Sequence, residues 1–257
     1  MTDNTLAALK DVTRTYGRIA VLDAAALNIK PGLTAIVGPN GSGKSTLLGV
    51  LAGVIEPTTG RVWRPDSTGT KPVGYLPQQV PFRSGFTARE TLAFYARLAD
   101  ADPDSALDAV GLADAAHRRV EALSGGMRRL LGIAQATLGD PSLVVLDEPT
   151  SGLDPGMRER AFDTAAAKAD DATAVVVSSH DLGLVDAYAD HVVVLARGRV
   201  VAAGDPDALC DEYGVDDMDA LYRAIINGAD PDREADEAPV SDGEVSEGVH
   251  VPGVSDR

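Results

Sequence analysis

The 257-residue sequence has a single cysteine, few aromatic residues and no long apolar run. The lone Cys210 cannot form an internal disulfide, which is typical of a reducing compartment, so we expect an inert, partly buried thiol. No apolar stretch approaches the roughly 18 residues that cross a bilayer, and the first residues lack the basic and then apolar layout of a signal peptide. We therefore expect a soluble, cytoplasmic protein whose 44% apolar residues fill a globular core.

Basic residues are also scarce. Lys and Arg number 23 against 39 Asp and Glu, which gives a net charge of -16. Because phosphate contacts need clustered Lys and Arg, this balance disfavours a nucleic-acid partner. Asp (29) outnumbers Glu (10) and Arg (18) outnumbers Lys (5), a bias that favours a salt-adapted protein over an ordinary acidic cytosolic one.

The first half of the chain divides into strands and then helices. Apolar and polar runs predict strands over residues 6–37, and a helix is expected from Lys44 onward. Thr87 with Glu90 three residues later forms a capping box, which predicts that a helix starts there. This helix leads into a helical stretch that we expect to reach about residue 122.

The second half alternates helices and strands from Ser124 onward, which is typical of an α/β fold. One mixed domain over residues 1–227, with a helical insertion at about 80–140, fits this order best. The remainder, 228–257, carries nine acidic residues and two Arg with few large apolar groups. We expect it to be a disordered acidic tail.

The strongest motif is a glycine-rich loop between a β-type run and a helix. It matches G-x-x-x-x-G-K-S, whose backbone N–H groups can curl around phosphate oxygens at the positive end of the helix. In such a loop Lys44 reaches the β- and γ-phosphates, and Ser45 can ligate magnesium. A glycine-rich turn without a ligand is the alternative. The predicted phosphate cradle comprises Gly38, Pro39, Asn40, Gly41, Ser42, Gly43, Lys44, Ser45 and Thr46.

Two carboxylates end a buried-type strand about 100 residues after the loop. They are Asp147 and Glu148, and neighbouring residues of a strand point to opposite faces, so we expect the two acids to have different roles. Asp147 would help to hold magnesium, usually through water, and Glu148 would polarise the water that attacks the γ-phosphate. Taken alone, such a pair is more often an exposed loop.

A third motif, Leu123–Met127, reads L-S-G-G-M and precedes a helix. The N-cap Ser124 and the glycines Gly125 and Gly126 expose N–H donors at the helix start, which could grip a second anion. On its own this is only a capping motif.

With this motif in place, the chain resembles the ATP-binding cassette family over residues 6 to 215. Tyr16 matches the family's adenine-stacking aromatic, Gln78 its glutamine loop, Asp154 the end of its D-loop and His180 its switch histidine. Each of these residues alone has a structural explanation, such as packing, surface exposure or helix capping. Seven such elements in the family's order are what the resemblance rests on.

The resemblance implies an α/β cassette with a RecA-like P-loop core, an N-terminal antiparallel β subdomain and an inserted helical subdomain. It implies that two cassettes meet head to tail, each ATP lying between one cradle and the other signature motif, and that a separate integral membrane permease sits at the inner face of the cell membrane. The ligands are ATP and Mg2+, and the second cassette is expected to be a second copy of this chain. ATP in cis would be served by Lys44, Ser45, Gln78, Asp147, Glu148 and His180, and the partner's ATP by Ser124, Gly125 and Gly126, with Asp154 nearby.

The sequence departs from the family's motifs at two positions, and two alternative functions stay open. Met127 stands where the family signature commonly ends in Gln, and Gln79 beside Gln78 leaves the metal-facing amide ambiguous, although we choose Gln78. A soluble cassette ATPase acting on a macromolecular partner and a non-enzymatic nucleotide sensor are the alternative functions. The run from Phe86 to Leu92 and the S-G-G-M-R-R run resemble multidrug and antibiotic exporters, so we expect export rather than import.

Overall fold

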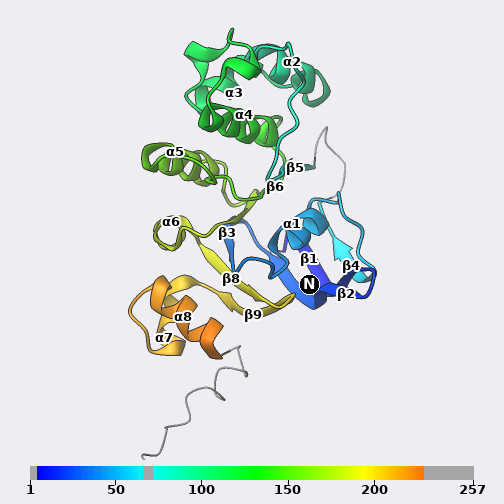
Figure 1. Cartoon of the computed structure of the whole chain (residues 1–257), viewed down its shortest axis with the longest axis vertical. Coiled ribbons are helices and arrows are strands. Elements are labelled where there is room, and N and C mark those ends of the chain that lie inside the picture. Colours follow the sequence, from blue (N-terminus) through cyan, green and yellow to red (C-terminus); the bar gives the residue numbers. More distant parts are fainter. Residues whose placement is uncertain (1–4, 66–71, 229–257) are drawn as a thin grey trace, which may run out of the picture.

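The computed structural model describes residues 5–65 and 72–228. A six-stranded sheet forms the middle of the molecule, a three-stranded sheet lies beside it, and a group of helices extends from the far end (Figure 1). The expected acidic tail lies outside the described residues, apart from Gly228.

The six-stranded sheet is parallel except at one edge. Its spatial order is β5-β6-β7-β3-β8-β9, and only β9 pairs antiparallel with its neighbour. Because β3 comes first in the chain but lies between later strands, the order reverses beside it, where α/β sheets commonly bind ligands. The strands are β3 Gly32–Val37, β5 Val73–Leu76, β6 Leu143–Leu146, β7 Ala174–Ser178, β8 His191–Ala196 and β9 Arg199–Gly204.

The second sheet contains β1 (Ala7–Tyr16), β2 (Ile19–Ile29) and β4 (Thr59–Trp63), with β1 in the middle and all pairs antiparallel. A tight turn at Gly17, where φ is 61°, joins β1 to β2 and pairs Tyr16 with Ile19. The strands expected over residues 6–37 are therefore confirmed, and they divide between two sheets.

Eight α-helices surround the sheets in the described part of the chain. Thr87 caps α2 and Glu90 completes the capping box, as predicted. The helical stretch expected from Thr87 to about residue 122 consists of α2, α3 and two single 3-10 turns, Ala113–Ala115 and Val120–Ala122. The helices are α1 Lys44–Leu51, α2 Ala88–Ala99, α3 Pro103–Ala109, α4 Gly125–Thr137, α5 Pro155–Ala166, α6 Leu182–Tyr188, α7 Pro206–Tyr213 and α8 Met218–Gly228.

No helix within residues 5–65 and 72–228 combines the length and the apolar character that a bilayer crossing requires.

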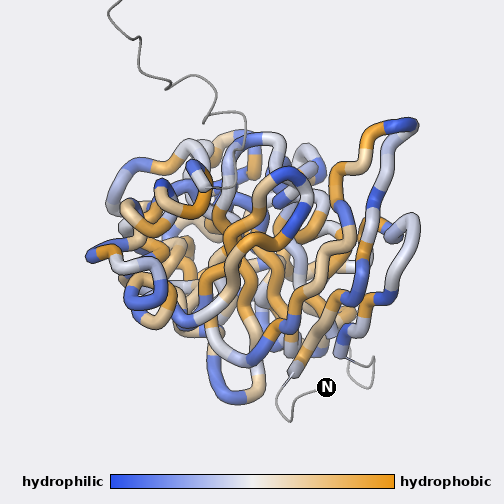
Figure 2. Tube along the Cα trace, turned by 90° about the horizontal axis from the view of Figure 1, so that it is seen from below, coloured by the Kyte–Doolittle hydropathy of each residue, from blue (hydrophilic) through white to orange (hydrophobic). Residues whose placement is uncertain are grey.

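The parallel strands bury both faces, and successive side chains enter different cores. In β6, Val144 and Leu146 join the cluster shared with α2, α4 and α5, whereas Leu143 and Val145 join the cluster shared with α1 and the three-stranded sheet. This period of two is what a strand covered on both faces requires. Hydrophobic residues accordingly concentrate along the central strands, and hydrophilic ones in the outer turns (Figure 2). The sheet is thus a rigid support for the loops at its ends.

Candidate active site

Four loops with expected functional residues follow four parallel strands. The glycine-rich loop follows β3, Gln78 follows β5, Glu148 follows β6 and His180 follows β7. Because the carboxyl ends of parallel strands lie at one edge of a sheet, these loops share that edge.

The glycine-rich loop passes very close to neighbouring backbone. A Cβ on Gly38 would lie 2.1 Å from the carbonyl oxygen of Leu195. At Gly43, where φ is 104°, a Cβ would lie 2.7 Å from the carbonyl oxygen of Val21. Both positions therefore require glycine, and the close fit fixes the loop's path above the sheet edge.

The start of α1 differs from the starts of the next six helices. A Ser, Thr or Asp side chain caps each of α2 to α7, whereas Gly43 at the start of α1 supplies no side-chain cap. The hydroxyl of Ser42 is also buried, and no partner for it is present in the described part of the chain. Uncapped N–H groups and an unsatisfied buried hydroxyl are what an anion-binding helix start provides.

Lys44 is folded back under the loop and is only 6% exposed. Its Nζ donates to the carbonyl oxygens of Gly38 at 2.7 Å and Pro39 at 3.0 Å. Burial lowers the pKa of Lys44, and the charges of Glu148 and Asp147 oppose that shift. The two carboxylates predicted from the sequence are therefore close enough to act on this ammonium.

Asp147 and Glu148 have different surroundings, as expected. Asp147 is buried and its Oδ1 accepts a hydrogen bond of 2.8 Å from the hydroxyl of Ser178, at the end of β7. The same Ser178 hydroxyl accepts the backbone N–H of Glu148 at 2.8 Å. The divergence does not come from strand alternation, because β6 ends at Leu146 and Glu148 has a left-handed backbone with φ of 49°.

The carboxylate of Glu148 is held at both oxygens. Gln78 Nε2 donates to Oε2 at 3.0 Å, and His180 Nε2 lies 3.1 Å from Oε1. The structure thus places the amide of Gln78 beside the carboxylate of Glu148. The choice of Gln78 over Gln79 as the metal-facing amide stays a prediction. A hollow of about 540 Å³ opens beside these groups, lined by Glu148, His180 and residues 150–152. Its walls leave space for a ligand next to the carboxylate.

The three side chains predicted to bind magnesium have the chemistry that this ion requires. Ser45, Gln78 and Asp147 offer a hydroxyl, an amide oxygen and a carboxylate, and oxygen atoms are the ligands that Mg2+ prefers. The described residues contain no group of three or more His, Cys, Asp or Glu side chains arranged to hold a metal. A magnesium ion held by these three side chains would complete its coordination with water and phosphate oxygens, as Mg2+ usually does.

Tyr16 lies at the end of β1 and is 46% exposed. The guanidinium of Arg14 stacks over its ring, 4.5 Å from the centroid, and Arg14 Nη1 also donates to the carbonyl of Glu56 at 3.0 Å. The strand that pairs with β1 contains Val21, whose carbonyl touches Gly43, so the hairpin that carries Tyr16 packs against the glycine-rich loop. The stacking of Arg14 on the Tyr16 ring was not predicted from the sequence.

The second glycine motif lies at the start of α4, where Ser124 and Gly125 are exposed and Gly126 is buried. Ser124 caps the helix by accepting the backbone N–H of Met127 at 3.1 Å. A Cβ on Gly125 would meet nothing within 4 Å, whereas one on Gly126 would meet Met157 and Leu153. Asp154 caps α5 in the same way, which is the structural role expected for it besides any ligand contact.

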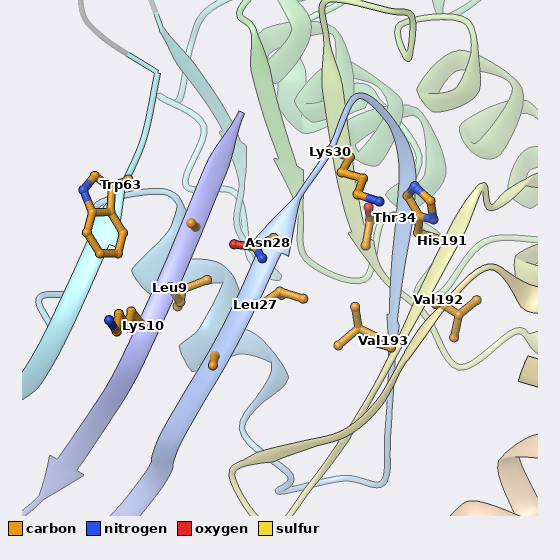
Figure 3. A pocket seen from close by; sticks show the side chains of 14 residues that line it. Leu9, Lys10, Leu27, Asn28, Lys30, Thr34, Trp63, His191, Val192 and Val193 are labelled. Carbon is orange, nitrogen blue, oxygen red and sulfur yellow. The ribbon is translucent and has the colours of Figure 1, made fainter. Parts of the chain in front are cut away.

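A larger hollow than the one beside Glu148 lies elsewhere. It measures about 790 Å³ and lies between the three-stranded sheet and β3, β8 and β9, with Lys10, Lys30, Trp63 and His191 on its walls (Figure 3). None of the predicted site residues lines it, so size alone does not locate the chemistry.

Sequence reasoning missed two residues that organise the site. Ser178 bridges the two carboxylate positions, and Arg129 in α4 contacts the backbone beside both Gln78 and Glu148. Both contacts join segments distant in sequence. The sequence's only hint was a second arginine directly after the glycine motif.

The parallel sheet, the uncapped glycine loop and the paired carboxylates define a P-loop nucleotide-hydrolysing cassette. The family model described as ABC transporter matches residues 22–151, and the chain belongs to that family as an ATP-binding subunit with ATPase activity. Nod factor export ATP-binding protein I of Rhizobium etli is 33% identical over 217 residues, covering 79% of this chain and 69% of that protein. Hemin import ATP-binding protein HmuV of Nocardia farcinica is 41% identical over 209 residues, covering 74% and 72%.

Other relatives extend this range. Daunorubicin resistance ATP-binding protein DrrA3 of Streptomyces coeruleorubidus is 32% identical over 255 residues, covering 88% of this chain and 81% of that protein. A solved ATP binding subunit of an ABC transporter is 25% identical with a TM-score of 0.77, covering 86% of this chain and all of that one. The dimeric ABC transporter cassette MJ0796 is 27% identical with a TM-score of 0.68, covering 77% and 98%, and was also solved with ADP and Pi. The relatives include both import and export proteins.

Proposed function

We propose that this chain hydrolyses ATP as one of two head-to-tail copies that drive transport through a separate membrane permease. The observation that carries the proposal is the contact of Gln78 and His180 with the two oxygens of Glu148, at the sheet edge that also holds Lys44. A nucleotide-binding module without hydrolysis has no need for a carboxylate held in this way.

In this proposal the loop from Gly38 to Thr46 binds the phosphates of ATP. The first-turn N–H groups of α1 and the Ser42 hydroxyl provide donors, and Lys44 exchanges its two carbonyl partners for phosphate oxygens. Tyr16, backed by Arg14, offers one exposed ring face to the adenine. Magnesium, held by Ser45, Asp147 and Gln78, would neutralise phosphate charge.

Glu148 acts as the general base for the attacking water. Its carboxylate is aimed by Gln78 and His180, and Ser178 fixes its backbone N–H, so the base is oriented before the reaction begins. In this proposal His180 would also lie beside the γ-phosphate, where an imidazole N–H would stabilise the charge that develops there. The reaction therefore relies on positioning and on electrostatic stabilisation of the transferring phosphoryl group.

The start of α4 serves the ATP of the other copy. Gly125 is exposed, and a Cβ there would meet nothing within 4 Å among the described residues, so in this proposal the helix start is open to an external anion. Ser124, whose hydroxyl caps the first turn of α4, lies next to Gly125 in the chain. A single copy holds one phosphate cradle and one such motif, so two copies complete two sites.

The permease would dock beside α2. A hollow of about 180 Å³ there is lined by residues that include Phe82, Phe86 and Phe94, and the exposed Phe94 (59%) and Leu98 (67%) adjoin it. Exposed apolar side chains gathered at one place typically mark a protein interface. The loop that carries this hollow follows Gln78 directly, so docking there reaches the catalytic edge. Through this contact the cassette would sit in the cytoplasm at the inner face of the membrane.

We infer export as the direction, on the strength of the Phe86–Leu92 and S-G-G-M-R-R resemblance and the long match to a drug-resistance protein. The test is reconstitution of the chain with the membrane protein that co-purifies with it, in vesicles with ATP outside. The proposal expects ATPase activity that the membrane protein stimulates and cargo that accumulates inside the vesicles. Cargo loss from preloaded vesicles would reverse the direction, and activity stimulated by a soluble macromolecule instead would contradict transport.

A further inference from the structure

Arg129 lies on α4, one turn after the Ser124 cap, and only 7% of its surface is exposed. Its Nη1 donates to the carbonyl oxygens of Pro77 at 2.8 Å and Gln78 at 2.9 Å. Its Nη2 donates to the carbonyl oxygens of Asp147 and Glu148, the latter at 2.8 Å. One guanidinium therefore joins four backbone carbonyls from two separate loops.

The two loops are those that carry Gln78 and Glu148. Their side chains meet at 3.0 Å. The paired strands β5 and β6 end at Leu76 and Leu146, and beyond them the one backbone hydrogen bond found between the two segments in the described part of the chain runs from the Asp147 N–H to the Leu76 carbonyl. Charge-assisted hydrogen bonds from the planar guanidinium are strong and fix geometry in two directions. Arg129 thus continues the alignment of the strands into the loops.

Glu148 needs such support. It is a non-glycine residue with a left-handed backbone, a conformation that persists only where surrounding groups enforce it. Its N–H is fixed by Ser178 and its carbonyl by Arg129. Both backbone polar groups of the expected base are therefore held by buried side chains.

Burying the guanidinium of Arg129 costs free energy that an apolar side chain at this position would not cost. Burial lowers the pKa of Arg129, and the charges of Asp147, Glu148 and Tyr75 oppose that shift. Its Nε, moreover, finds no hydrogen-bond partner among the residues that the structure describes. A buried charge with an unmet donor is costly, which points to a role beyond packing.

We propose that Arg129 is a positioning residue that holds Gln78 and Glu148 in register and ties both to the helix start at Ser124 and Gly125. The inference rests on the proposed function, because the helix start serves the ATP of the second copy. When a nucleotide engages that helix start, α4 and its guanidinium move together, and the cis carboxylate is positioned in response. The residue itself touches neither nucleotide.

The test compares Arg129→Gln and Arg129→Lys with the matched variant Arg128→Gln, whose arginine is exposed and donates to the Leu123 carbonyl. Steady-state ATPase assays give kcat and KM, a fluorescent ATP analogue gives affinity, and thermal melting reports the fold. We expect Arg129→Gln to lower kcat about 10- to 100-fold with affinity within about threefold of wild type. Arg129→Lys should fall between, because an ammonium cannot span four carbonyls. Arg128→Gln should retain wild-type kcat.

Wild-type kcat in a folded Arg129→Gln or Arg129→Lys variant would overturn the inference. So would a parallel loss of kcat, affinity and melting temperature, or unfolding of both variants, since either outcome makes Arg129 purely structural. These outcomes are separable from failure of the proposed function. If the proposed function is wrong, the wild-type chain will not hydrolyse ATP, or its specific ATPase activity will not rise with protein concentration as a site shared by two copies requires.

Discussion

The amide of Gln78 donates to the carboxylate of Glu148 at 3.0 Å, although the two residues are 70 positions apart in the sequence. Gln78 begins the loop that leads to the exposed aromatic residues of the helical group, and Glu148 lies in the loop that follows the neighbouring strand β6. This single contact connects the surface proposed for the permease to the group proposed for catalysis. A displaced loop would therefore displace the base.

Replacing Glu148 with Gln removes the proton acceptor and keeps the shape. We expect ATP affinity to stay within about threefold of wild type and turnover to fall by ~100-fold or more, in line with the usual contribution of a general base. Phosphate release and equilibrium nucleotide binding measure the two quantities. Glu159→Gln, at an exposed position of α5, is the control. Turnover near wild type in Glu148→Gln would remove this residue from the base role.

Lys44→Ala should weaken nucleotide binding instead. Truncating one member of a buried charged contact typically costs about 2 kcal/mol or more, which corresponds to an affinity loss of about 30-fold. Calorimetric titration with ATP and magnesium measures it. The exposed Lys10→Ala variant controls for the change in net charge. Equal affinities of the two variants would contradict the assignment of the phosphate cradle.

The sequence predicted those features of the fold that are local. The apolar run of β6, the Thr87 and Glu90 capping box and the Asp154 cap each depend on residues within a few positions, and all are present. β9, α7 and α8 were not predicted. Asp205 before Pro206 repeats the Asp154 and Pro155 pattern and would have indicated the start of α7.

The site was predictable as a set of residues but not as a network. Motif order brought Lys44, Glu148 and His180 together correctly at one sheet edge. The hydrogen bonds of Ser178 and Arg129 span 31 and up to 52 positions and depend on how strands and helices pack. Local periodicity contains no information on such contacts, and the left-handed backbone of Glu148 equally follows from its surroundings.

Tyr16→Ala should raise the KM for ATP while leaving kcat close to wild type. Stacking of a base on an aromatic ring contributes about 1–3 kcal/mol, so we expect an increase between about 5-fold and 150-fold. Tyr16→Phe keeps the ring and should restore the wild-type KM. Tyr213→Ala removes an exposed tyrosine from α7 as the control. An unchanged KM in Tyr16→Ala would exclude adenine stacking on this residue.

Leu98→Asp tests the surface beside α2. Leu98 is 67% exposed, so a charge there should leave the basal ATPase rate unchanged while preventing docking of an apolar partner. Stimulation of ATPase activity by the co-purifying membrane protein is the measurement. Val54→Asp introduces the same charge at another exposed apolar position, which is 61% exposed, and should retain stimulation. Equal stimulation of both variants would show that the permease binds elsewhere.

Sedimentation of Glu148→Gln with ATP and magnesium tests the central claim most directly. We expect nucleotide to convert the Glu148→Gln chain to a species of twice its mass, because hydrolysis no longer separates the two copies. The double variant that also carries Gly125→Arg should stay a single copy. A Cβ on Gly125 would meet nothing within 4 Å among the described residues, so this second change should leave the fold and cis nucleotide binding intact. An ATP-bound Glu148→Gln chain that stays single, or a pair that survives Gly125→Arg, would contradict a site shared between two copies.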